Sequence, residues 1–202
     1  MNLILASTSP YRRRLLERLC LPFTCMDPAI EESMWEGESP PERASRLSTE
    51  KASAAAQTLQ GNAIVIGSDQ VACLDTQILH KPVTPTVAER QLAASSGRTV
   101  HFWTAVSVWT SPDQPPTQRV VPCEVKMRAL SAAEITRYVA LDQPLDCAGS
   151  FKWESLGITL FEAIRTDDPT ALEGLPLIAL GELLREAGIS LPLAAQPAQH
   201  GL

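Results

Sequence analysis

Leu3–Arg14 reads LILASTSPYRRR, an apolar run followed by three hydroxyl residues, a proline, a tyrosine and three arginines. The run Leu3–Ala6 is too short for a helix and is bounded by small residues, which predicts a buried strand. Ser9 and Pro10 stand in the order that is typical of an N-cap and a first helical residue. The stretch therefore predicts a strand that passes directly into a helix, which we expect to end near Leu19.

The three arginines, Arg12 to Arg14, would lie in the first turns of that helix, where unpaired backbone N–H groups already carry partial positive charge. An anion held at the junction by N–H groups, hydroxyls and guanidinium groups would remove the repulsion, and a polyphosphate is the natural candidate. A solvated basic helix face is the alternative. Because neither GxxxxGK[ST] nor GxGxxG occurs here, the junction is not an ordinary P-loop or Rossmann turn.

The composition is that of a globular protein, with 202 residues of which 45% are hydrophobic and 20% charged. A net charge of −6 argues against binding of long nucleic acid through a basic surface. The chain starts without a signal-peptide pattern and has no apolar run long enough to span a membrane. The five cysteines form no CxxC pair, which indicates reduced thiols and no zinc site. We therefore expect a cytoplasmic protein without nucleic-acid or membrane partners.

Strands and helices alternate along the rest of the chain. We expect strands over 23–26, 63–66, 71–74, 100–108, 118–127 and 157–164. We expect helices over 40–59, 85–95, 132–141 and 175–187. The long strands 100–108 and 118–127 would form an antiparallel ribbon, so the pattern predicts an α/β fold with a mixed, twisted sheet flanked by helices. It predicts one domain over 1–188 and a flexible tail over 189–202.

Acidic residues stand at two notable places, and at Asp69 a carboxylate between buried runs would be costly without a partner. Gly67-Ser68-Asp69-Gln70 interrupts two buried apolar runs, and Glu31 and Glu32 are adjacent carboxylates after the second strand. Isolated lysines follow at Lys51, Lys81 and Lys152. Because Mg²⁺ is usually held by carboxylates together with substrate phosphates, the set predicts metal-assisted hydrolysis of a nucleotide polyphosphate. The alternatives are a structural aspartate at Asp69 and a solvated lysine at Lys51.

These motifs, taken in order, resemble the Maf family of nucleoside triphosphate pyrophosphatases. The resemblance runs from about residue 3 to 187, through LILASTSPYRRR, IEES, EKA, IGSDQV, the Lys81-Pro82 pair, AGSFKWES, GITLFEAI and GLPLIAL. It implies an ITPase-like α/β fold with two lobes and an active-site cleft. It also implies a hydrolase of acid anhydrides, which releases diphosphate and a nucleoside monophosphate. The chain is most similar to the bacterial branch that acts on 7-methyl-GTP and so removes a modified nucleotide.

The resemblance carries roles to single residues. Asp69 would be the proton acceptor that activates water, and Glu32 would join Asp69 around a divalent metal, Mg²⁺ or Mn²⁺. The phosphate-binding positions are Ser7, Arg12, Arg13, Lys51 and Lys81. The positions that set base specificity are Tyr11, Gln70 and Glu154.

The 7-methyl-GTP branch also has a physical rationale. Methylation at N7 gives guanine a delocalised positive charge, which an aromatic ring attracts. Tyr11, which replaces the tryptophan of the nearest branch, would supply that ring with somewhat weaker stacking; Trp153 is a second candidate or a core aromatic. Glu154 can accept from guanine N1–H and N2–H, whereas thymine and uracil offer one such donor.

Two other functions remain open on the sequence. One is the same chemistry on dTTP and UTP, the substrates of the sister branch. The other is a non-catalytic nucleotide sensor in cell-division control, which intact Asp69 and Glu32 disfavour because a sensor needs no water-activating carboxylate. The family further suggests a homodimer.

Overall fold

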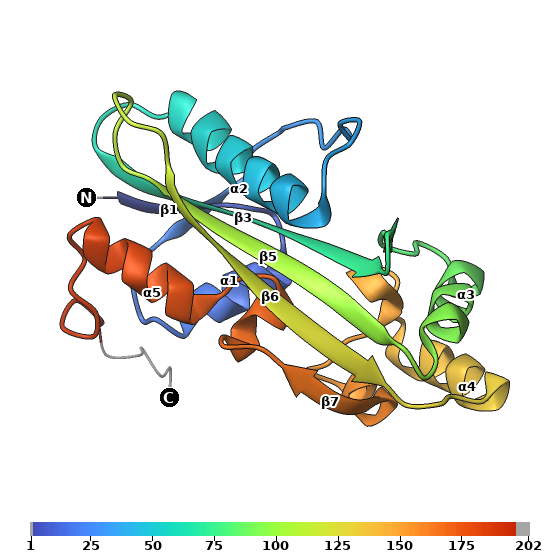
Figure 1. Cartoon of the computed structure of the whole chain (residues 1–202). Coiled ribbons are helices and arrows are strands. Elements are labelled where there is room, and N and C mark those ends of the chain that lie inside the picture. Colours follow the sequence, from blue (N-terminus) through green and yellow to red (C-terminus); the bar gives the residue numbers. More distant parts are fainter. Residues whose placement is uncertain (1, 197–202) are drawn as a thin grey trace. The chain divides into compact units, whose positions relative to one another are not determined.

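The structure is a computed structural model that describes residues 2–196. Its strands are β1 (Asn2–Ala6), β2 (Thr24–Met26), β3 (Ala63–Leu74), β4 (Gln77–Ile78), β5 (Thr99–Trp109), β6 (Thr117–Met127) and β7 (Phe161–Arg165). The sheet has the order β2-β1-β3-β5-β6-β7, with β4 paired to β3 (Figure 1). Because β1 pairs in parallel with β2 and β3 while β6 and β7 are antiparallel, the predicted mixed sheet is confirmed.

The chain divides into two compact units. Of the described residues, unit 1 contains 2–69, 104–121 and 168–196, and unit 2 contains 70–103 and 122–167. The strands β3, β5 and β6 contribute residues to both units. Two lobes were expected from the resemblance.

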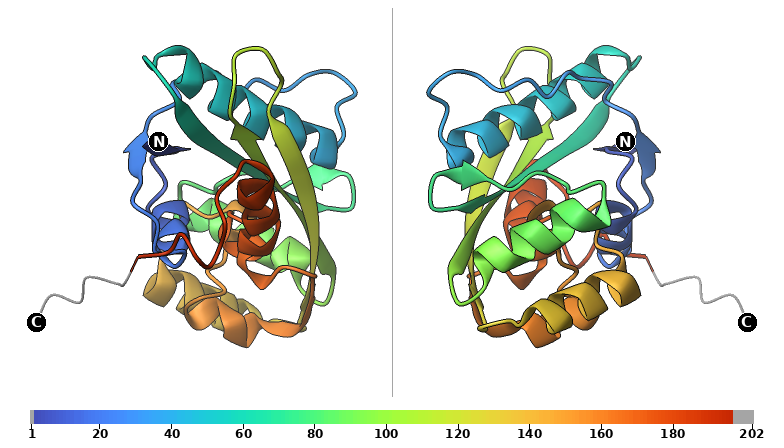
Figure 2. Two further views of the ribbon diagram at one scale, coloured as in Figure 1. Left: turned by 90° about the vertical axis from the view of Figure 1, so that its left-hand side faces the viewer. Right: turned by 90° about the vertical axis from the view of Figure 1, so that its right-hand side faces the viewer.

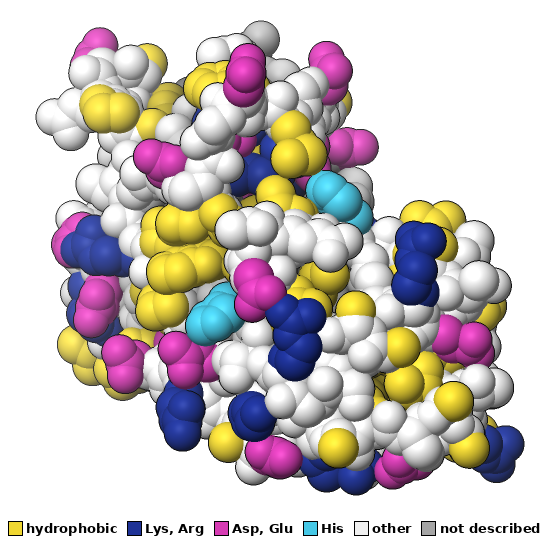
Figure 3. All heavy atoms as spheres, turned by 45° about the vertical axis from the view of Figure 1, so that its right-hand side comes forward, with side chains coloured by type: hydrophobic (Ala, Val, Ile, Leu, Met, Phe, Trp, Pro, Cys, Tyr) yellow, Lys and Arg dark blue, Asp and Glu magenta, His cyan; other side chains and the backbone are white. Residues whose placement is uncertain are grey.

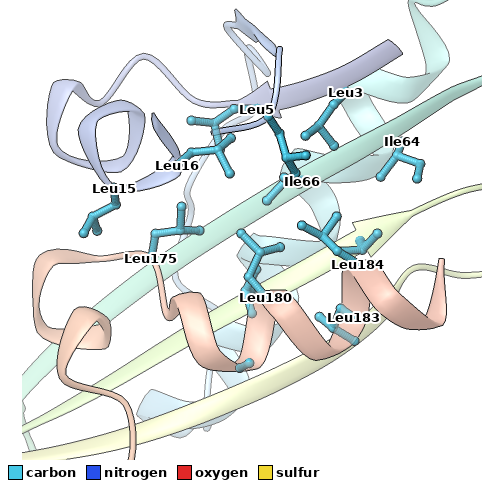
Figure 4. Close-up of a cluster of buried hydrophobic side chains, with 14 of the residues drawn as sticks. Leu3, Leu5, Leu15, Leu16, Ile64, Ile66, Leu175, Leu180, Leu183 and Leu184 are labelled. Carbon is cyan, nitrogen blue, oxygen red and sulfur yellow. The ribbon is translucent and has the colours of Figure 1, made fainter. Parts of the chain in front are cut away.

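Unit 1 buries both faces of β1 and of the first half of β3. Its helices are α1 (Pro10–Glu17), α2 (Pro40–Gln57), the 3-10 turn η3 (Pro169–Glu173) and α5 (Leu177–Glu186). Leu5 and Ile66 pack with leucines of α1 and α5 (Figure 4). Ile4 and Val65 are the neighbours of Leu5 and Ile66 in β1 and β3, so their side chains point to the other face of the sheet. There they pack against alanines of α2, which lies on the opposite face from α5 (Figure 2). Strands buried on both faces read as continuous apolar runs, which explains the composition of LILA and AIVI.

Unit 2 contains α3 (Pro85–Ser95), α4 (Ala132–Asp142) and the 3-10 turns η1 (Ala148–Ser150) and η2 (Leu156–Leu160). The helices α3 and α4 lie side by side (Figures 1 and 2). Phe151 stands between Phe102 and Phe161, with edge-to-face ring contacts at 5.4 and 4.7 Å between centroids. Ser131 and Glu134 form a capping box at the start of α4.

Two local predictions are wrong. The segment Gly67–Gln70 does not interrupt the strand, because β3 runs unbroken from Ala63 to Leu74 and Asp69 finds a buried ionic partner. The stretch 157–164 is extended only from Phe161, since Leu156–Leu160 forms a 3-10 turn. At Gly157 a Cβ would lie 2.3 Å from Lys152 O, so the backbone folds back there too tightly for a strand.

The predicted tail over 189–202 lies partly outside the described residues. Ile189 and Leu191 pack against the core of unit 1, and the Gln196 N–H donates to Cys20 O at 2.8 Å. The flexibility of the segment stays a prediction. The five cysteines are free thiols, of which Cys73 and Cys123 are buried.

Surface and hydropathy agree with the composition. Between residues 2 and 196 no helix combines the length and apolar character that crossing a membrane requires. On the face drawn in Figure 3, basic and acidic side chains are interspersed and form no large basic patch.

Candidate active site

The junction between β1 and α1 forms as predicted. Ser9 is the N-cap of α1, and its Oγ accepts from Arg12 N–H at 3.4 Å, with Pro10 at the first helical position. Ser7 is buried, and its Oγ accepts from Ser9 N–H at 3.1 Å. Two of the three hydroxyls therefore shape the turn that starts the helix.

Arg12 is the arginine that turns toward the interior of unit 1. Its Nε donates to Gly174 O at 2.8 Å, and Ser68 Oγ lies 2.8 Å from the same oxygen. Burial lowers the pKa of Arg12 from its ordinary value, while the carboxylates of Asp69 and Glu32 act in the opposite direction. Because an arginine remains protonated in proteins, a fixed positive charge stands in the field of these two carboxylates.

Arg13 and Arg14 have different surroundings. Arg13 is exposed and its Nε lies 3.1 Å from Glu17 Oε1 one turn along α1. The Arg14 guanidinium lies over the Tyr11 ring, 5.1 Å from its centroid. For these two arginines the solvated helix face describes the structure, and phosphate binding by Arg13 stays a prediction.

Lys51 brings two of the predicted carboxylates together. Its Nζ lies 2.5 Å from Asp69 Oδ1 and 2.6 Å from Glu32 Oε1. Lys51 and Asp69 are each only 6% exposed, whereas the Glu32 side chain is 53% exposed. The alternative of a solvated lysine at position 51 is therefore wrong. The cluster brings together Lys51 of α2, Asp69 of the buried strand β3 and Glu32 of an exposed loop.

Gly67 explains how Lys51 reaches Asp69. A Cβ at Gly67 would lie 2.1 Å from Ser48 O and 2.7 Å from Ala52 N, both in the backbone of α2. Only glycine lets the helix approach the strand this closely.

Two arginines of α2 were missed by sequence reasoning. Arg43 donates to Glu32 O at 2.7 Å and to Ser33 O at 3.0 Å, and Arg46 also donates to Ser33 O at 3.0 Å. Both lie near Glu38, whose pKa is lowered mainly by its hydrogen bond with Arg46. Their spacing, three residues apart on the helix that carries Lys51, is the signal that could have found them.

The remaining predicted residues belong to unit 2. Lys81 and Glu154 are exposed, and Gln70 is partly buried. Lys152 is engaged within its own unit, where Nζ donates to Asp142 O at 3.0 Å. Contact of Lys81, Gln70 and Glu154 with a substrate stays a prediction.

Glu32 and Asp69 are the residues predicted to bind a divalent cation. Across the described chain no group of three His, Cys, Asp or Glu residues could hold a metal by itself. Mg²⁺, however, usually binds one or two carboxylates and takes its other ligands from water and substrate phosphates. The pair already converges on a positive charge, that of Lys51, so its chemistry fits such a cation.

Comparison with known proteins gives the family. Residues 2–187 match the sequence profile of the family described as "Maf-like protein". The chain belongs to the Maf family. The resemblance carried by the sequence motifs is therefore confirmed, and the profile covers the whole Lys51–Asp69–Glu32 cluster of this Maf chain.

Named relatives are similar over almost the full length. A "7-methyl-GTP pyrophosphatase" from Xanthomonas oryzae pv. oryzae (strain MAFF 311018) is 58% identical over 95% of the Maf chain and 99% of the relative. A protein of the same name from Aromatoleum aromaticum is 52% identical over 95% of the chain and 98% of the relative. Among solved structures, a nucleoside-triphosphatase / dITP/XTP pyrophosphatase from Mycobacterium abscessus matches with a TM-score of 0.46 and 15% identity, covering 96% of this chain and 99% of that one.

Proposed function

We propose that this Maf chain is a nucleoside triphosphate pyrophosphatase that hydrolyses 7-methyl-GTP to 7-methyl-GMP and diphosphate. The observation that carries the proposal is that the buried Lys51 ammonium contacts the carboxylates of both Asp69 and Glu32. The same two carboxylates also interact electrostatically with the Arg12 guanidinium. Hydrolysis of a phosphoanhydride uses a carboxylate to accept a proton from water and cations to stabilise the negative charge that develops on the phosphate, and both kinds of group meet in this cluster. Relatives that are up to 58% identical carry the name of this activity.

The reaction assigns a proton transfer to Asp69. Water attacks the α-phosphorus, its proton passes to a carboxylate oxygen of Asp69, and the bond between the α-phosphorus and the bridging oxygen breaks to release diphosphate. Lys51 holds the Asp69 carboxylate in place by its contact at 2.5 Å. Negative charge that develops on the phosphoryl oxygens is stabilised by fixed cations, which is usually a large term in such catalysis.

Phosphate binding falls to the residues around the β1–α1 junction and to the lysines. In this proposal Ser7, Arg12, Arg13, Lys51 and Lys81 bind the triphosphate. Arg12 is the best prepared of them, because Gly174 O fixes its Nε while its other guanidinium nitrogens remain able to donate.

Glu32 and Asp69 would hold a divalent cation, Mg²⁺ or Mn²⁺, together with substrate phosphate oxygens. When bound, such a cation polarises a phosphoryl oxygen and lowers the pKa of water. The open position of Glu32 suits this role, since its side chain is half exposed.

Base specificity is proposed for Tyr11, Gln70 and Glu154. The Tyr11 ring already attracts the cation of Arg14, and a methylated guanine carries a similar delocalised charge. The carboxylate of Glu154 would accept from the two donors of the guanine edge. We further propose a cytoplasmic location, in keeping with the five free cysteines, and a homodimer, which light scattering after size exclusion would test.

Purified protein with Mg²⁺ should be incubated separately with 7-methyl-GTP, GTP, dTTP and UTP while diphosphate and orthophosphate are measured. We expect diphosphate chiefly from 7-methyl-GTP, and its loss in Asp69→Asn by about 10²- to 10⁴-fold. Release chiefly from dTTP and UTP would contradict the roles of Tyr11 and Glu154. No turnover of any nucleotide would favour the sensor.

A further inference from the structure

The loop that carries Glu32 has little regular structure of its own. Residues 27–39 contain neither helix nor strand, and Glu32 and Ser33 are exposed. The backbone of this loop is nevertheless fixed at two successive carbonyls. Arg43 spans both of them, with Nη2 donating to Glu32 O at 2.7 Å and Nη1 to Ser33 O at 3.0 Å.

The side chains that supply these contacts are buried and mutually held. Arg43 is only 7% exposed and lies 3.8 Å from Glu38, whose side chain is 8% exposed. Arg46 donates to both oxygens of Glu38, from Nε at 2.6 Å and from Nη2 at 2.8 Å. The same Nη2 also donates to Ser33 O at 3.0 Å. Trp35 covers the Arg46 guanidinium with its ring, 4.1 Å from the centroid. The loop is thus attached to α2 by arginines whose own positions are restrained.

Both ends of Glu32 are therefore anchored to one helix. Its carbonyl is bound by Arg43, and its carboxylate is bound by Lys51, which follows Arg43 by about two helical turns. Since the helix is rigid between these points, the distance between backbone and side-chain anchors is set. This restraint directs the Glu32 carboxylate to the Lys51 ammonium, which also contacts Asp69, although about half of the Glu32 side chain is open to solvent.

We propose that Arg43, supported by Arg46, is a positioning residue that holds Glu32 in the productive geometry of the site. The inference rests on the proposed function insofar as Glu32 acts on substrate. A guanidinium is required because its planar fork reaches two adjacent carbonyls, whereas a lysine ammonium in the same place can replace the charge but not the two-point contact.

The test compares Arg43→Lys and Arg43→Gln with Arg119→Gln, a control that removes an arginine whose contacts are with Glu182 and Glu186 of α5 and with Gln118 O of its own strand. Hydrogen exchange is followed in peptides that cover 28–38 and 44–56. In parallel, kcat/KM for 7-methyl-GTP and the Mg²⁺ concentration at half-maximal rate are measured. The same substitutions are also made in a Glu32→Gln background.

We expect Arg43→Lys to speed exchange in 28–38 while 44–56 stays protected, and to lower kcat/KM by roughly 10- to 100-fold with a higher Mg²⁺ requirement. In the Glu32→Gln background, Arg43→Lys should lower kcat/KM little further than Glu32→Gln alone, because Arg43 acts through Glu32. If Arg43→Gln also speeds exchange in the peptide 44–56, that variant has lost its native helix, and the result for Arg43→Lys alone tests the proposal. Wild-type exchange and activity in Arg43→Lys would overturn the proposal, as would an equal loss with and without Glu32.

Exchange also separates this inference from the proposed function. Should the wild-type protein hydrolyse none of the four nucleotides, the proposed function fails while the restraint on 28–38 is still measured. Faster exchange in Arg43→Lys, confined to the peptide 28–38, would then support the restraint of the loop by Arg43. Unchanged exchange would overturn it.

Discussion

The Lys51 ammonium lies 2.5 Å from the Asp69 carboxylate, and both residues are more than nine-tenths buried. Glu32 completes the arrangement from the solvent side, 2.6 Å from the same nitrogen. A buried charge is tolerated only with such partners, so the groups proposed for chemistry also stabilise unit 1.

Replacing Lys51 by methionine should therefore destabilise the protein at neutral pH. The change leaves the Asp69 carboxylate buried without its cation, and breaking a buried pair from one side costs about 3 to 5 kcal/mol. The free energy of unfolding from urea titration measures the effect. Adding Asp69→Asn to Lys51→Met should recover part of the loss, because it removes the unpaired charge. A Lys51→Met protein as stable as the parent would contradict the ionic role of this pair.

The close approach at Gly67 predicts a second destabilising substitution. In Gly67→Ala the new methyl group would meet Ser48 O and Ala52 N of α2, so the helix must move away from β3. We expect a loss of about 1 to 3 kcal/mol from overpacking, together with lower activity since Lys51 moves with the helix.

Gly181→Ala is the matched control for that substitution. A Cβ at Gly181 meets only Arg185 Nη1, at 3.5 Å, and alanine favours a helix over glycine. Its midpoint in urea should equal or exceed that of the parent. Equal stability of Gly67→Ala and Gly181→Ala would show that α2 does not depend on the glycine.

The capping box of α4 predicts a pH dependence in unit 2. Hydrogen bonds from the Ser131 backbone and hydroxyl, with a smaller contribution from Arg128, lower the pKa of Glu134 from 4.5 to about 2. Because the folded pKa lies below the unfolded one, the stabilisation is complete above about pH 4.5 and is lost as pH falls toward 2. Glu134→Gln should thus be less stable than the parent at neutral pH, by a margin that shrinks across this window. Urea titrations at several pH values measure it, and a constant margin would contradict the assignment.

Tyr11 should affect the choice between nucleotides more than their turnover. If its ring stacks on the cationic base, Tyr11→Leu should lower the ratio of kcat/KM for 7-methyl-GTP over GTP by roughly 2- to 30-fold. Both substrates share the same phosphates, so general damage to the site cancels in the ratio. Tyr11→Trp should keep or raise the ratio. An unchanged ratio in Tyr11→Leu would place the base elsewhere.

Local signals explain which elements could be predicted from the sequence. The start of α1 at Pro10 and both bounds of α3, Pro85 and Ser95, follow from a capping hydroxyl, a proline and, for α3, a closing glycine within a few residues. The 3-10 turn at Leu156–Leu160 could not be predicted this way. It depends on Gly157 lying against the backbone of Lys152, and apolar composition does not encode this contact.

The candidate site could be predicted in its residues but not in its geometry. The family motifs pointed to Lys51, Asp69 and Glu32, yet only the fold shows that one ammonium contacts both carboxylates. Arg12 and Arg13 are adjacent in sequence and diverge because successive helical residues point about 100° apart. The role of Arg43 could not be predicted from side-chain pairing, since its two hydrogen bonds to the loop go to backbone carbonyls.

The hydrogen bond from Arg12 to Gly174 O joins residues that are 162 positions apart in the chain. During translation Arg12 is synthesised early, but its acceptor Gly174 belongs to the last segment of unit 1. Every described residue of unit 2 is synthesised before Gly174. A nascent chain halted before Gly174 has the motif LILASTSPYRRR in full but no acceptor to orient its key arginine. The contact that orients Arg12, a proposed phosphate-binding residue, thus forms only near the end of synthesis, and a product truncated before Gly174 would carry LILASTSPYRRR without it.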